Sequence, residues 1–221
     1  MKTGVAATQA FSHEALMAAA DPRYNAPIPL VRNVSTTKEK HTIKLFLRNN
    51  PTDATAGVYE HTFFLFESGE AEDYCRLQQQ FAILERGQPI TTPEGKYSGY
   101  AKLLAGVAAD HWQTICDSQV GGQTNETFDA AVKEFAKAYM DEYALIEQKQ
   151  YMRKRVGCPK TMTVRQFWTR LCEMNNLSRY LRKHREEETI IPEDELKSIY
   201  VHAMPQWMRN LMDRANFRWY L

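Results

Sequence analysis

Residues 124–146 read TNETFDAAVKEFAKAYMDEYALI, and this stretch sets the expectation for the whole chain. Its apolar side chains recur at steps of three and four residues, at Phe128, Val132, Phe135, Tyr139, Tyr143 and Ile146. That spacing places them along one face of a helix, as in a helix that buries one side in a core. Thr124 or Asn125 can cap the first turn, and Gly157-Cys158-Pro159 would end the last. We therefore expect one long helix here.

Helix starts of the same kind lie on both sides of this stretch. Downstream, Thr163 can cap a helix, and Pro192-Glu193-Asp194-Glu195 and Pro205 can open two more. Upstream, the acidic residues after Ser68 and the run Thr92-Pro93-Glu94 mark two further starts. Each start is followed by apolar residues at helical spacing, which predicts a mostly helical chain.

Two shorter segments break the helical pattern near the N-terminus. Residues 41–48 alternate between apolar and polar side chains, and residues 59–66 are rich in aromatic and other strand-favouring types. Gly57 and the run Asn49-Asn50-Pro51 interrupt the chain between them, as in a turn. We expect a two-stranded hairpin, which is marginal alone and must pack on helices or pair with another chain.

These signals divide the chain into three parts. Three prolines between residues 22 and 29, with no sustained apolar periodicity, predict a flexible N-terminal arm over residues 1–40. Gly121-Gly122 is the clearest later boundary, so residues 41–120 and 121–221 are the two expected domains. The predicted fold class is mostly α, with two small helical units and a short N-terminal β-hairpin.

Composition excludes several classes of protein. Only 10 of the 221 residues are glycine and 9 are proline, which argues for long helices and against many short strands. With 43% hydrophobic and 25% charged residues, the chain is typical of a globular protein. Its apolar runs, such as Phe63-Phe64-Leu65-Phe66, are far shorter than the roughly 18 residues of a membrane span, and the N-terminus does not read as a signal peptide. We expect a cytoplasmic protein with no membrane partner.

No set of residues forms a recognisable active site. The chain contains no phosphate-binding glycine loop, no dinucleotide fingerprint, no His-Glu-x-x-His and no nucleophile elbow. The four cysteines are too far apart for a zinc or redox pair, and the six histidines are scattered. We interpret Cys116 as a core residue and His111 as a surface residue, not as a nucleophile and its base. We expect no catalytic residue, metal, cofactor or small-molecule substrate, and a small helical enzyme stays the third alternative.

Charge is distributed unevenly, although 28 basic and 27 acidic residues nearly cancel. From Lys149 to Arg185 there are eleven basic side chains and one acid, and acidic residues lie on both sides of this block. Such a block can contact phosphate groups, can pair with acidic blocks between helices or between copies of the chain, or can be a solvated surface. The candidates for nucleic-acid binding are Lys149, Arg153, Lys154, Arg155, Arg182, Lys183 and Arg185.

Five blocks of residues follow one another in an order that resembles a known family. They are Leu103-Leu104-Ala105-Gly106-Val107-Ala108 with Trp112, Phe128-Asp129-x-Ala131-Val132, Thr163-Val164-Arg165-Gln166-Phe167, Ile191-Pro192-Glu193-Asp194-Glu195-Leu196 and Met204-Pro205-Gln206-Trp207. In this order they resemble the capsid region of Gag proteins from copia- and gypsy-type retrotransposons. That family often carries a zinc knuckle that grips RNA, and this sequence has no such spacing of Cys and His.

The resemblance implies a structural protein that self-associates into a virus-like shell in the cytoplasm and packages element RNA. Its partners would be further copies of itself and RNA. Aromatic and methionine side chains are typical of interface cores. The expected assembly residues are Met204, Trp207, Met208 and Met212. The alternative is an adaptor that binds nucleic acid through residues 149–185 without forming a shell.

Overall fold

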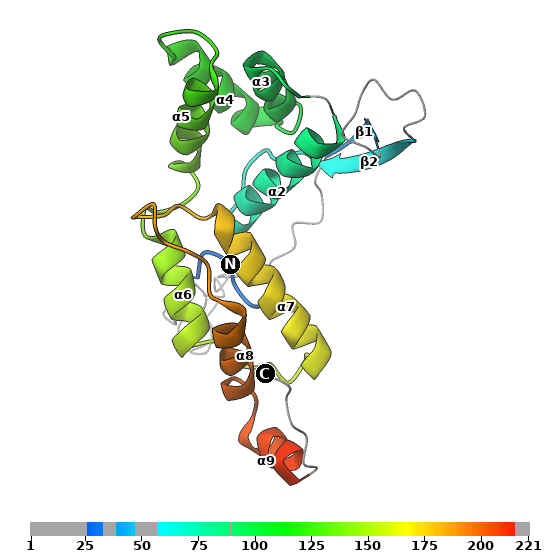
Figure 1. The fold of residues 1–221 in the computed structure, drawn as a ribbon, viewed down its shortest axis with the longest axis vertical. Helices are drawn as coiled ribbons and strands as arrows, with labels where there is room; N and C mark the ends of the chain where they lie inside the picture. Colours follow the sequence, from blue (N-terminus) through cyan, green and yellow to red (C-terminus); the bar gives the residue numbers. More distant parts are fainter. Residues whose placement is uncertain (1–25, 33–38, 47–56, 89, 215–221) are drawn as a thin grey trace, which may run out of the picture.

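The computed structural model of the chain describes residues 26–32, 39–46, 57–88 and 90–214. Its strands and helices are β1 (Lys40–Phe46), β2 (Val58–Phe64), α2 (Ala71–Gly87), α3 (Pro93–Ala101), α4 (Gly106–Ser118), α5 (Asn125–Ala136), α6 (Ala144–Lys154), α7 (Val164–Leu177), the 3-10 helix η2 (Ser178–Tyr180), α8 (Glu193–His202) and α9 (Gln206–Arg214). The predicted class is confirmed, since the chain is mostly helical with a short antiparallel hairpin near its N-terminus (Figure 1).

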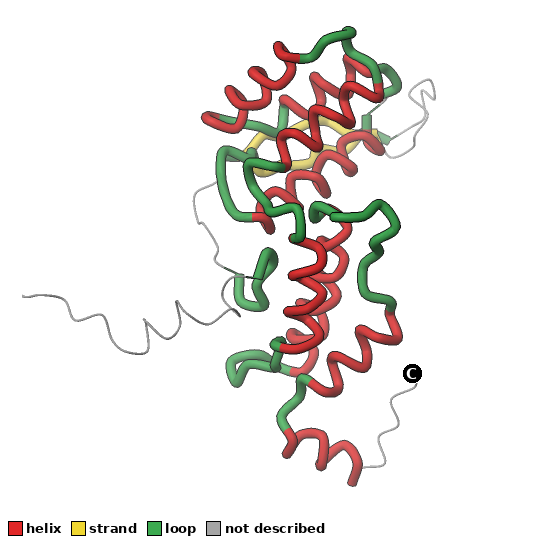
Figure 2. The backbone as a smooth tube through the Cα atoms, turned by 90° about the vertical axis from the view of Figure 1, so that its left-hand side faces the viewer, coloured by secondary structure: helices red, strands yellow, loops and turns green. Residues whose placement is uncertain are grey.

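The helices form two groups along the length of the molecule (Figure 1 and Figure 2). The first group contains α2, α3, α4 and α5, with the hairpin at its side, and the second contains α6, α7 and α8. The two groups meet where α2 lies against α7. α9 lies at the far end of the molecule, beyond α8.

The hairpin packs on the helices through one of its faces. Ile43, Leu45 and Phe63 are buried on that face. Leu45 lies so close to Gly87, at the end of α2, that a Cβ added to the glycine would be 2.9 Å from the leucine side chain. α2 therefore supplies the support that a two-stranded sheet lacks on its own.

Aromatic rings fill the core of the first group. The ring of Trp112 in α4 lies 4.5 Å from that of Tyr100 in α3 and 5.7 Å from that of Phe135 in α5, measured between centroids. Phe81 of α2 lies 5.1 Å from Tyr100. Because these rings come from four helices, burying them fixes how α2, α3, α4 and α5 pack together.

Three side-chain amides each bond both backbone groups of one distant residue, and we call these pairs the amide clips. The pairs are Gln80 with Phe64, Gln148 with Ile28, and Asn175 with Ile191. In each pair the amide oxygen accepts from the backbone N–H and the amide nitrogen donates to the backbone carbonyl, over 2.7–3.1 Å. Gln148 and Asn175 are buried, so the clips satisfy polar groups that water does not reach.

The prediction of one long helix from the apolar spacing is wrong, because this stretch forms two helices. α5 ends at Ala136 and α6 begins at Ala144. Between them the carboxylate of Asp141 accepts a hydrogen bond from the N–H of Tyr143 at 2.8 Å. A short polar side chain that bonds nearby backbone in this way competes with the helix. The apolar period continues through the turn, so periodicity alone does not reveal it.

The contacts between helices do not divide the chain at Gly121-Gly122. These glycines have φ angles of 107° and 81°, which turn the chain sharply after α4. α4 and α5 nevertheless pack on each other across that turn, and α5 also contacts α3. The change from the first group to the second therefore comes after α5, in the turn that breaks the expected long helix.

Part of the expected flexible arm lies in the core. In the N-terminal segment, residues 26–32, the side chains of Ile28 and Leu30 are buried, which corrects the expectation for these residues. The physical reason is that apolar residues beside prolines can be buried one by one, without helical or strand periodicity. Residues 1–25 and 33–38 of the expected arm lie outside the described part of the chain.

Candidate assembly and nucleic-acid surfaces

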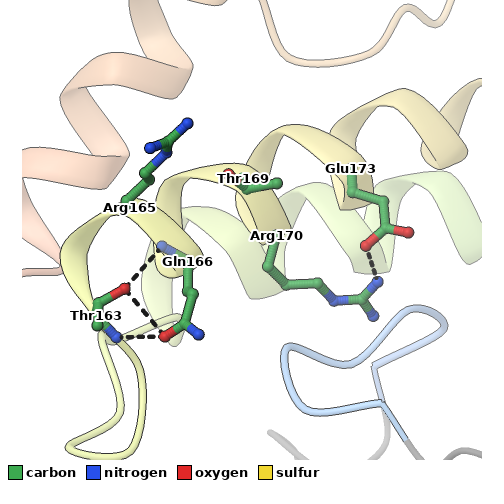
Figure 3. A pocket seen from close by; sticks show the side chains of 6 residues that line it. All are labelled: Thr163, Arg165, Gln166, Thr169, Arg170 and Glu173. Carbon is green, nitrogen blue, oxygen red and sulfur yellow. Dashed lines mark hydrogen bonds and ion pairs between the residues drawn. The ribbon is translucent and has the colours of Figure 1, made fainter.

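The start of α7 carries a capping box and a shallow pocket. Thr163 Oγ1 accepts from the N–H of Gln166 at 3.2 Å, and Gln166 Oε1 accepts from the N–H of Thr163 at 2.9 Å. This reciprocal pair satisfies two donors that would otherwise lack helical partners. The pocket has a volume of about 330 Å³ and is lined by Thr163, Arg165, Gln166, Thr169, Arg170 and Glu173 (Figure 3).

Buried charges join α7 to α2 beside this pocket. Arg170, 8% exposed, and Glu72, 5% exposed, bond to each other through Nη2 and Oε2 at 2.7 Å. Arg170 Nη1 lies 2.8 Å from Glu173 Oε2. Arg76 Nη2 contacts both carboxylates, at 2.8 Å from Glu72 and 2.6 Å from Glu173. We call these four residues the α2–α7 ion network, and it links the two groups of helices by charge-assisted hydrogen bonds.

The network holds Glu173 and Arg170 in their charged forms. Burial raises the pKa of Glu173, but hydrogen bonds from Arg170 and Arg76 lower it by more than burial raises it. The pKa of Glu173 therefore lies below its usual value. Burial lowers the pKa of Arg170, and its bonds to Glu72 and Glu173 outweigh this and raise the pKa. Sequence counting placed Arg170 in a basic block, whereas the structure shows a buried guanidinium that has its partners inside the chain.

Arg153, one of the nucleic-acid candidates, pairs with another helix. Its Nη2 atom lies 3.0 Å from Glu195 Oε2 at the start of α8. Hydrogen bonding from Arg153 lowers the pKa of Glu195, so the carboxylate stays charged. This contact matches the interpretation in which basic and acidic blocks pair between helices.

Lys149 and Arg182 also bond within the chain. Lys149 Nζ donates to the carbonyl of Thr189 at 3.0 Å, and Arg182 Nη1 donates to the carbonyl of Met140 at 3.1 Å. Both bonds run between α6, or the turn before it, and the loop before α8. These two cations therefore help to hold that loop against α6.

The other four nucleic-acid candidates are exposed but do not form one surface. Lys154 and Arg155 lie at the C-terminal end of α6. Lys183 and Arg185 belong to the loop that meets the other end of α6, where Leu145 N–H donates to Arg182 carbonyl. An 11-residue helix separates these ends by roughly 15 Å. No ion pair joins the four to another residue that the structure describes.

The four expected assembly residues have different surroundings. Met204 is buried, at 3% exposure, so it does not offer the exposed side chain that an assembly residue needs. Met208 is half-buried and packs against the core. Trp207, at the start of α9, is 60% exposed. The side chain of Met212 lies outside the described part of the structure.

Comparisons with known proteins do not assign these surfaces. No protein-family model, curated protein or solved structure matches the chain. Among the described residues, none of the helices combines the length and the apolar character needed to cross a membrane. The same residues contain no group of three or more His, Cys, Asp or Glu side chains that could hold a metal ion.

His111 and Cys116 show no base and nucleophile geometry in the described structure. The ring of His111 lies 5.2 Å from that of Phe135, against the aromatic core. Burial raises the pKa of the Cys116 thiol, which opposes formation of the nucleophilic thiolate. Sequence reasoning missed the α2–α7 ion network, because the pairs that join its two helices are 97 and 98 positions apart in the chain.

Proposed function

We propose that the protein is a structural subunit that self-associates, as the capsid region of Gag proteins does, into a cytoplasmic virus-like shell. The single observation that carries this proposal is Trp207, a tryptophan 60% exposed on a helix at the end of the molecule (Figure 1). Exposed tryptophans are enriched among the residues that dominate binding energy in protein interfaces. The ordered sequence blocks described above add support to the same proposal.

The position of α9 explains why this side chain is available. α9 follows Pro205, and Met208, within its first turn, packs against the core. Trp207 lies on the part of the helix that the described residues leave uncovered. Burying a large aromatic side chain against a second copy would contribute roughly 1.5–3 kcal/mol to association.

The test measures association of the full chain and of two variants. Sedimentation velocity and electron microscopy across protein and salt concentrations should detect particles or oligomers of the natural chain. Trp207→Ser should weaken association at least about tenfold, since roughly 1.4 kcal/mol corresponds to a factor of ten. Val120→Ser is the matched control, because Val120 is 93% exposed but lies in the loop between α4 and α5.

Two outcomes would contradict the proposal. The first is a chain that stays monomeric under every condition. The second is a Trp207→Ser variant that associates like the natural chain while remaining helical by circular dichroism.

RNA is the second candidate partner, with or without a shell. Lys154 and Arg155 are adjacent and exposed, and they line a pocket of about 290 Å³ at the end of α6. Cations that reach phosphate groups release counterions, so affinity falls as salt rises. This observation favours a limited contact with the RNA backbone, made by fewer residues than the sequence block contains.

Fluorescence anisotropy with single-stranded RNA tests this contact. Replacing both Lys154 and Arg155 by Ala should weaken binding and reduce the slope of log affinity against log salt by about 1.4, since each single-strand phosphate contact contributes about 0.7. Lys102→Ala, which removes an exposed cation after α3, should leave the slope unchanged. An unchanged slope in the double variant would exclude these two residues as the phosphate contact.

A further inference from the structure

The outer edge of β2, which faces away from β1, carries backbone groups that no described residue bonds. The amide clip shows which groups face outward, because the N–H and carbonyl of Phe64 bond Gln80 and not β1. Backbone groups alternate in direction along an antiparallel strand, so those of Thr62 and Glu60 face outward as well. Both residues are exposed, and no hydrogen bond reaches their outward N–H and carbonyl groups from the residues that the structure describes.

The two edges of the hairpin differ in how they are protected. On the outer edge of β1, the carbonyl of Lys44 accepts from Gln88 Nε2 at 3.2 Å, and Lys40 adds a second cation. Lysines on an edge strand discourage another strand from pairing there. β2 contains neither lysine nor proline, and its side chains Val58 and Phe64 are 54% and 49% exposed. The edge of β2 is therefore the one that can accept a further strand.

The residues of β2 complement a second β2 in one antiparallel register. Centring the pair on Glu60 would place two glutamates opposite each other, which destabilises a sheet. Centring it on Thr62 would require the backbone groups of Phe64 that already form an amide clip. Centring it on His61 places Glu60 opposite Thr62 of the second copy. The same register places Val58 opposite Phe64 of the second copy, so exposed apolar side chains meet at both ends of the contact.

A shell needs a second contact on each copy, because a single two-fold contact closes as a dimer. α9 lies at the far end of the molecule, whereas the hairpin lies at the side of the first group of helices (Figure 1). We propose that β2 pairs with β2 of a second copy about a two-fold axis at His61, which joins two strands from each copy into one antiparallel sheet. This inference rests on the proposed self-association and names a contact distinct from α9.

The pairing would supply partners that the hairpin lacks. Glu60 and Thr62 of each copy would exchange both backbone hydrogen bonds with Thr62 and Glu60 of the other. A two-stranded sheet is marginal, and further strands stabilise it. The new ladder would end at the amide clip between Gln80 and Phe64, which fixes its length and register.

Matched proline variants of the full chain test the pairing. Thr62→Pro removes an outward N–H that the single chain does not use, and edge strands tolerate proline at such positions. Made in the Trp207→Ser chain, it should raise the dissociation constant measured by sedimentation at least about tenfold, because the ladder loses a donor. Thr42→Pro is the control, since Thr42 pairs with Thr62 across the strands and faces outward on the edge of β1. It should leave association unchanged, and circular dichroism should show that both variants remain helical.

Disulfide trapping tests the position of the two-fold axis. His61 would lie opposite its counterpart in a pair without backbone hydrogen bonds, where Cα atoms are roughly 4.5 Å apart and a disulfide can form. Mild oxidation of the His61→Cys chain should therefore give a covalent dimer. Mass spectrometry of the linked peptides distinguishes this bond from bonds through the natural cysteines. Thr42→Cys, on the edge of β1, is the control and should give no dimer linked at the substituted position.

The outcomes separate this inference from the proposed function. Assemblies that form equally in the Thr62→Pro and Thr42→Pro chains, without the His61→Cys link, would overturn the β2 contact and leave self-association through α9 intact. Dimers that are lost in Thr62→Pro but never grow into larger particles would support the β2 contact and overturn the shell. A chain that is monomeric at every concentration would overturn both.

Discussion

Arg170 connects three parts of the chain through a single side chain. Its guanidinium donates to Glu72, to Glu173 and to the carbonyls of Pro29 and Leu30. Only arginine offers five donors in a rigid planar fork, so lysine could not reproduce this set. The sequence shows a cation on a predicted helix and nothing of its partners, which lie far away along the chain. Buried charge therefore could not be predicted from local spacing.

Replacing Arg170 by Met should destabilise the protein by about 3–5 kcal/mol, because it leaves the carboxylate of Glu72 buried without its closest partner. Urea unfolding followed by circular dichroism measures the change. Arg165→Met is the control on the same helix, because Arg165 is exposed, and its effect should stay within about 0.5 kcal/mol. Equal effects of the two variants would contradict a structural role for the buried pair.

Glu173 should make stability depend on pH. Its pKa is lowered in the folded chain, so its contribution is complete above the ordinary glutamate pKa of about 4.3 and is lost as the pH falls through the lower native value. The urea concentration at the unfolding midpoint of the natural chain should therefore decrease as the pH is lowered from about 6 to about 3. Glu173→Gln should show a smaller fall, and an identical fall would contradict the assignment.

Local signals located most of the helices and the hairpin. The predicted cap at Thr163 and the predicted proline start at Pro93 are the observed starts of α7 and α3. The turn between α5 and α6 was missed, because Tyr139 and Tyr143 continue the apolar period through it. A single carboxylate, that of Asp141, bonds the backbone there, and such a residue is also common on helix surfaces. Local capping was thus predictable and this helix break was not.

Thr163→Ala should destabilise the protein by about 1 kcal/mol, since it removes the side chain that caps α7. Thr169→Ala removes the same atoms from an exposed position within α7 and should change stability by less than about 0.5 kcal/mol. Chemical unfolding of both variants measures the difference. A Thr169→Ala effect as large as that of Thr163→Ala would show that the cap is not the cause.

At the scale of the molecule, the net charge is close to zero, but the cations have different structural environments. Arg170 is buried, Arg153 pairs with Glu195, and Lys154 and Arg155 remain exposed. The uneven distribution of charge is visible in the sequence. A count of charges, however, cannot distinguish a cation that joins two helices from one that faces water. The same limit applies to the predicted assembly residues, among which Met204 is buried and Trp207 is not.

The α2–α7 ion network should make the two groups of helices unfold together. Hydrogen exchange of α4 and α8 in increasing urea should give coincident opening curves for the natural chain. In Arg170→Met the two curves should separate, because the variant weakens the contact between groups more than it weakens either core. Curves that are already separate in the natural chain would show that the network does not couple the groups.

The amide clips have a consequence for how the sequence can change over evolution. Each clip recognises a backbone N–H and carbonyl, which every residue except proline possesses. The clipped residues Phe64, Ile28 and Ile191 can therefore be exchanged for residues of similar size without a compensating change in the amide. Diverged copies of this protein should keep Gln80, Gln148 and Asn175 while the opposite positions drift, so these close contacts would leave no trace as correlated substitutions.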